Sequence, residues 1–146
     1  MRLRIFGAAA LGAALSLGAT GAAFAHHSFG AEFDQNAPVT LTGEVIKFDW
    51  VNPHSWIYID AVNPKTGQHE KWRVEGGAPS ALLRRGWDRN TLKPGTKIIV
   101  RAFRARDGDT RASAAEIAFP NGAVMSLGNP QTEAAEAAAA RAKGNN

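Results

Sequence analysis

A proline between two aromatic segments constrains the fold of this chain more than any other feature. Residues 48–58 read Phe-Asp-Trp-Val-Asn-Pro-His-Ser-Trp-Ile-Tyr. Pro53 fixes its own φ angle and disfavours helical backbone at Asn52. The alternating apolar residues on both sides are typical of strands. The sequence therefore predicts two strands that meet at an Asn52-Pro53-His54 turn.

The rest of the chain continues in strand-like segments separated by glycine, proline and asparagine turns. Pro79 and Gly86 suit the start and the stop of a short helix. We expect strands at 39–50, 55–62, 69–75, 96–105 and 111–119, a short edge strand at 124–127 and a helix near 78–86. The order strand, strand, strand, short helix, strand, strand predicts an all-β domain, specifically a small OB-like five-stranded barrel. An open sandwich of five or six strands is the alternative.

The first strand changes phase along its length. Leu41 and Val45 share one face by a period of two, whereas Ile46 and Phe48 continue on the other face. The change follows Gly43, and glycine inside a strand often marks a bulge or a sharp bend. We expect a bulge or coil at this place.

The amino-terminal segment has the three parts of a secretory signal peptide. A basic start is followed by an apolar run at 5–17 and by Ala23-Phe24-Ala25, a small-x-small cleavage pattern. We predict cleavage after Ala25 and a periplasmic or secreted protein with no stable membrane insertion afterwards.

The remaining chain divides by composition. We expect an extended lead-in at 26–37, the barrel domain at 38–128 and an Ala-rich flexible tail at 129–146. Removal of residues 1–25 lowers the formal charge from +4 to +2, because it removes two arginines and no acids. This modest charge argues against nucleic acid as a partner. The chain has no cysteine, so thiolate metal sites are excluded.

The histidines suggest a metal site. Cleavage after Ala25 would give His26 a free amine, so that this residue could chelate an ion through its amine and its imidazole. His27 and His54 would add further imidazoles, and such a nitrogen-rich set suits copper best among transition metals. The alternative is a solvated chain end, with His54 hydrogen-bonded to its own turn. His69 is expected to be an exposed histidine.

A second candidate site is aromatic. Phe48, Trp50, Trp56 and Tyr58 belong to the two strands that flank His54. On one outer face they would form a stacking platform at the mouth of the barrel. Alternatively, the two tryptophans close the end of the barrel as part of the core.

No catalytic constellation is visible. Nucleophile elbows, phosphate loops and zinc-protease motifs are all absent from the sequence. We therefore interpret the protein as a binding module and not an enzyme. It would bind a transition metal ion, copper for preference, through His26, His27 and His54. The alternative is a metal-independent module that binds a periplasmic protein, a peptide or a glycan through the aromatic mouth.

Several short motifs resemble a bacterial family of short exported proteins of unknown function. They are His26-His27-Ser28-Phe29, Gly43-Glu44-Val45, Trp50-x-Asn52-Pro53-His54, Trp72-x-Val74-Glu75 and Leu83-x-Arg85-Gly86-Trp87. The resemblance runs from about residue 26 to residue 127. It implies a small β-barrel and an exported location, and it supplies no catalytic residues.

Overall fold

The computed structural model describes residues 29–128 and 130–144, which form a mostly β structure. The strands of this region are β1 (Phe33–Asp49), β2 (Trp56–Val62), β3 (His69–Glu75), β4 (Lys97–Ala105), β5 (Arg111–Ala118) and β6 (Val124–Ser126). The helices are α1 (Phe29–Glu32), α2 (Pro79–Leu83) and α3 (Pro130–Gly144). The predicted mostly-β class and the short helix between the third and fourth strands are confirmed.

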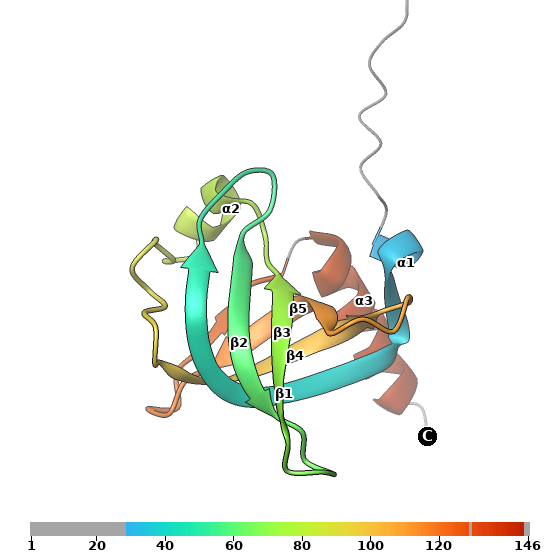
Figure 1. The fold of residues 1–146 in the computed structure, drawn as a ribbon. Helices are drawn as coiled ribbons and strands as arrows, with labels where there is room; N and C mark the ends of the chain where they lie inside the picture. Colours follow the sequence, from blue (N-terminus) through green and yellow to red (C-terminus); the bar gives the residue numbers. More distant parts are fainter. Residues whose placement is uncertain (1–28, 129, 145–146) are drawn as a thin grey trace, which may run out of the picture.

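The strands form one sheet in the order β3-β2-β1-β4-β5-β6, with antiparallel neighbours throughout (Figure 1). An additional parallel pairing joins residues 73–75 of β3 to residues 111–113 of β5. Each of the strands β1 to β5 therefore has two partners among the same five strands, and β6 extends the sheet beyond β5.

Strand β1 serves both halves of the sheet. It pairs with β4 up to Glu44 and with β2 from Gly43 onward, and Figure 1 shows its long, curved course. The register shifts between Val45 and Lys47, which is the bulge that the phase change predicted. The extra residue, Ile46, is exposed, whereas Phe48 packs against the core. The bulge thus returns the strand to its original inner face.

The main core lies between the inner faces of the strands and α2. Its fully buried members include Ile57, Ile59, Val74, Leu82, Trp87, Val100, Ile117 and Leu127. The indole N–H of Trp87 donates to the carbonyl of Ser126 at 2.8 Å, so this large side chain is both packed and hydrogen-bonded.

A second, smaller cluster holds the two ends of the described chain together. Phe29 and Phe33 pack with Phe103, with ring centroids 5.7 Å apart for the first two and 5.6 Å for Phe29 and Phe103. Instead of a fully extended lead-in, residues 29–32 form the short helix α1.

The carboxyl-terminal segment, expected to be a frayed helix or a disordered tail, is a helix that packs against the sheet. Residues 130–144 form helix α3, and its Thr132 and Ala135 are buried. The hydroxyls of Thr132 and Ser113 lie 2.7 Å apart. These contacts escape a search for an apolar stripe because small side chains make them.

The predicted signal peptide, its cleavage site and the two leading histidines fall within residues 1–28, outside the described residues. Within the described part of the chain, no helix has the length and apolar character needed to cross a membrane.

Candidate functional site

The turn between β1 and β2 is anchored to the end of β3. Ser55 is fully buried, and its hydroxyl and its backbone N–H both donate to the carbonyl of Gly77, at 2.9 and 3.1 Å. The N–H of Gly76 donates in return to the carbonyl of Ser55 at 2.9 Å. The residue directly after His54 is thus held in place by three hydrogen bonds.

The Gly76-Gly77 pair makes this anchoring possible. A Cβ atom at Gly76 would lie 2.6 Å from the Ser55 hydroxyl oxygen and 2.8 Å from Cγ of Leu127. The N–H of Gly77 donates to the carbonyl of Leu127 at 2.7 Å. Glycine is needed at position 76 because the turn and the segment after β6 approach the backbone closely.

His54 faces a buried carboxylate. Nδ1 of His54 lies 3.2 Å from Oε1 of Glu75, the last residue of β3, which is only 8% exposed. This nitrogen is itself buried and makes no hydrogen bond with the described residues. The His54 side chain as a whole is 35% exposed.

Burial raises the pKa of the Glu75 carboxyl above its ordinary value, and the neighbouring His54 opposes that rise. Glu32 raises the same pKa further, whereas Arg111 and Arg73 lower it. Arg111 donates to Oε2 of Glu32 at 2.7 Å. These interactions place α1 in the electrostatic surroundings of Glu75.

The four candidate aromatic residues do not share one face. Phe48 and Trp50 pack against the core, with ring centroids 5.4 Å apart, and Phe48 contacts Trp87 at 6.2 Å. Trp56 and Tyr58 alternate along β2 with the buried Ile57, so they lie on the opposite face.

On that outer face, cationic side chains cover the two rings. The Arg73 guanidinium lies 4.9 Å from the ring centre of Trp56, and Nζ of Lys47 lies 4.1 Å from that of Tyr58. These two aromatics therefore form a polar, cation-covered surface and not an open stacking platform.

Of the three predicted metal ligands, the described residues include only His54. Within the described ranges, no group of three or more His, Asp or Glu side chains is arranged to hold a metal ion. Sequence reasoning recognised Glu75 within a motif and missed its contact with His54. The available signal was that the strand containing Glu75 ends in two glycines, a place where another segment can approach closely.

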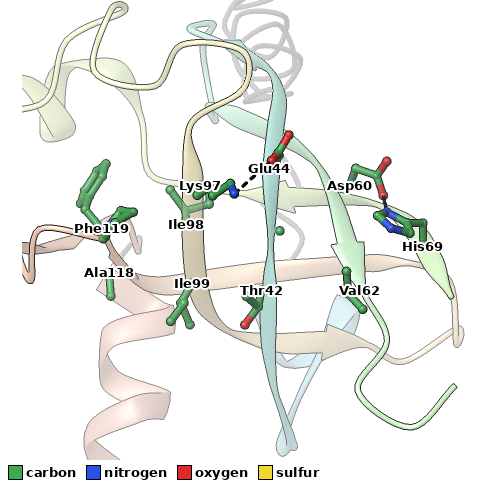
Figure 2. A pocket seen from close by; sticks show the side chains of 12 residues that line it. Thr42, Glu44, Asp60, Val62, His69, Lys97, Ile98, Ile99, Ala118 and Phe119 are labelled. Carbon is green, nitrogen blue, oxygen red and sulfur yellow. Dashed lines mark hydrogen bonds and ion pairs between the residues drawn. The ribbon is translucent and has the colours of Figure 1, made fainter. Parts of the chain in front are cut away.

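His69 lies elsewhere, at the opposite end of β3, and is exposed as predicted. Its Nδ1 lies 2.8 Å from Oδ1 of Asp60. The two residues lie at the rim of a cavity of about 470 Å³ on the outer face of the sheet (Figure 2).

The structure defines a small mostly-β protein in which a half-exposed histidine contacts a buried glutamate beside its first strand-connecting turn. A family model described as a family of unknown function, DUF6152, matches residues 14–114, more than half of the chain. The chain therefore belongs to this family. Neither a comparison with curated proteins nor one with solved structures finds a match.

Proposed function

We propose that this protein is an exported OB-like β-barrel that binds a transition metal, copper for preference. The metal would be held at the Asn52-Pro53-His54 turn by His54 and the histidines of the processed amino terminus, His26 and His27. The observation that carries the proposal is the His54–Glu75 pair, a buried carboxylate beside a buried ring nitrogen that makes no hydrogen bond with the described residues.

The strand pairings support the barrel. The pairs β1–β2, β2–β3, β3–β5, β5–β4 and β4–β1 form a ring, in the strand sequence typical of an OB-fold. A long first strand that coils through Gly43 and a bulge is the device that such closure needs.

The His54–Glu75 pair is expected to lower the stability of the fold, which supports a functional role for it. A buried carboxylate and an unsatisfied buried nitrogen both destabilise a fold. Metal-binding histidines commonly donate the N–H of one ring nitrogen to a carboxylate, which orients the other nitrogen toward the ion. A small rotation of the His54 ring would bring Nδ1–H onto Glu75 and leave Nε2 for the metal.

The position of α1 supports participation of the leading histidines. Glu32 belongs to the electrostatic surroundings of Glu75, and the described chain begins three residues earlier at Phe29. His27 precedes Phe29 by two residues, and two residues of extended chain can reach about 7 Å. An amine, imidazole nitrogens and no thiolate favour Cu(II) over softer ions.

Copper titration of the exported protein tests this proposal. The amino terminus is first determined by mass spectrometry, because retention of Met1 would exclude His26 as an amine ligand. Cu(II) affinity is then measured by calorimetry for the parent and for His54→Ala, with His69→Ala as the control. We expect His54→Ala to weaken copper binding at least about tenfold. Loss of a residue that only orients a metal ligand typically lowers metal affinity about 10–100-fold, and loss of a ligand should cost no less.

His69→Ala should leave copper affinity unchanged, since His69 lies at the far end of β3. Equal losses in the two variants, or affinity no higher than that of a short His-His peptide, would disprove the copper site.

The outer face of β2 favours a second candidate function, metal-independent binding of a periplasmic protein, peptide or glycan. The observation is the pairing of Trp56 with Arg73 and of Tyr58 with Lys47 on this face. Phe48 and Trp50 pack on the core side, so they would support this surface from beneath. Trp56→Ala should then weaken partner binding, whereas His54→Ala should not. Neither candidate function is enzymatic.

A further inference from the structure

An exposed apolar row crosses the outer face of the sheet, far from His54. Strand register aligns Thr42 of β1 with Ile99 of β4, Ile99 with Ala118 of β5, and Ala118 with Val124 of β6. Ile99 is 43% and Val124 57% exposed. Ile99 and Val124 are separated in this row only by Ala118, and apolar side chains gathered on a surface indicate a binding region more strongly than scattered ones do.

Three members of this row, Thr42, Ile99 and Ala118, form one side of the cavity shown in Figure 2. Val62, Thr42, Ile99 and Ala118 lie in a row along that side. Its volume of about 470 Å³ lies within the range of about 300–1,000 Å³ typical of small-molecule sites. The lining is mainly apolar, as such sites usually are.

The opposite side of the cavity carries two carboxylates. Glu44 and Asp60 are directly opposite each other in the β1–β2 register, and Figure 2 shows both at the rim. Like charges directly opposite across strands repel each other. Two exposed side chains contact the carboxylates: Nζ of Lys97, 75% exposed, lies 3.9 Å from Glu44, and Nδ1 of His69, 68% exposed, lies 2.8 Å from Oδ1 of Asp60. Contacts at such exposed positions neutralise the pair only weakly.

We propose that this cavity binds a small molecule with an apolar body and a positively charged amine at one end. The apolar body would contact Ile99, Val62 and Ala118, and the ammonium group would lie between Glu44 and Asp60. The ammonium would relieve the repulsion between the carboxylates, whereas a carboxylate at the same end of the ligand would add to it. This site is separate from the proposed metal site and uses none of its residues.

The test compares three ligands that share one apolar chain: octylammonium, octanol and octanoate, each below its micellar concentration. Binding to the purified protein is measured by amide chemical shifts in ¹H–¹⁵N NMR spectra. We expect octylammonium to bind tightest and octanoate weakest, with the largest shifts at Thr42, Val62 and Ile99.

Two variants separate the contributions of charge and apolar contact. The double variant Glu44→Gln/Asp60→Asn should weaken octylammonium binding about threefold to tenfold and leave octanol unchanged. Ile99→Ser should weaken all three ligands, whereas Ile46→Ser, an equally exposed isoleucine outside this cavity, should weaken none.

Octanoate binding as tightly as octylammonium would overturn the proposal, as would shifts that map away from the cavity. The ligand series uses the unaltered protein, so it decides the matter even if a variant fails to fold. A negative copper titration would not affect this result.

Discussion

Glu75 is the residue at which stability and the proposed function oppose each other. Its carboxyl is buried at the end of β3, beside His54 and within the field of Glu32 and Arg111. The net effect of these surroundings is a raised pKa, so the charged form is disfavoured in the folded state. A residue kept for packing alone would not need to be ionisable at this place.

We expect Glu75→Gln to gain stability, relative to the parent, as pH rises from about 4 to about 7. The folded-state pKa of Glu75 lies above its unfolded value of about 4.3. Its protonated form therefore contributes stability below that value, and this contribution is lost as pH rises through the folded-state pKa. Glutamine does not titrate, so melting temperatures of both proteins across this range give the difference directly.

The control for this experiment is Glu44→Gln, at a carboxylate whose side chain is 56% exposed. This variant measures the effect of the same Glu-to-Gln change at an exposed position. If Glu75→Gln instead lost more stability at neutral pH than at acidic pH, the ion pair with His54 would outweigh burial, contrary to our account.

Strand β1 is the element that determines the shape of the sheet. It pairs with β4 along its first part and with β2 along its second, and the two parts meet at Gly43. A side chain there would collide with the backbone carbonyl oxygen of Asp60 and would lie 2.7 Å from Cα of Ala61. The strand can therefore coil at this position only without a Cβ atom.

We expect Gly43→Ala to destabilise the protein by about 1–3 kcal/mol or more, the range for overpacked sites, because backbone atoms must move to accept the methyl group. The control is Gly30→Ala in α1, where a Cβ would meet no atom within 4 Å. Chemical denaturation of both variants measures the difference. Equal stability of Gly43→Ala and the parent would show that the coil does not depend on this close approach.

At the scale of the whole molecule, the two ends of the described chain meet on one side of the sheet. Figure 1 shows α1 and α3 next to each other, and the N–H of Phe29 donates to the Gln131 side chain at 3.0 Å. Phe29, Phe33, Phe103 and Ala135 bury one another there. Helix α3 is therefore part of the folded unit.

We expect removal of residues 130–146 to destabilise the protein by about 1–3 kcal/mol, through loss of the Thr132–Ser113 hydrogen bond and the cover over the phenylalanines. The matched control removes only residues 137–146, whose described side chains are exposed. Thermal unfolding compares the two truncations. Identical stability of both would mean that α3 adds nothing to the fold.

The structure confirms much of the fold that the sequence predicts. Strands β2 to β6 lie within one residue of their expected bounds, whereas β1 begins at Phe33, six residues before the expected start and inside the expected lead-in. The bulge near Gly43 lies where the phase of the pattern changes. These features depend on alternation, turn residues and glycine, which act over a few neighbouring positions. The packing of helix α3 could not be predicted, because its buried side chains, Thr132 and Ala135, leave no apolar stripe in the sequence.

The candidate site could be predicted only in part. His54 and the aromatic residues stand out in the sequence, but their grouping does not. Phe48 and Trp50 turn inward because of the bulge, while Trp56 and Tyr58 face outward beside cations.

Local sequence by itself determined the strands, the turn and the place of the bulge, because backbone preferences and side-chain alternation operate within a segment. Only the tertiary structure decided that Glu75 lies beside His54, and that Glu44 lies opposite Asp60. Both contacts join segments distant in the chain, so they arise from strand register and from the anchoring of Ser55 to Gly77. Pairing between strands depends on how all of them pack together, and no single segment encodes it.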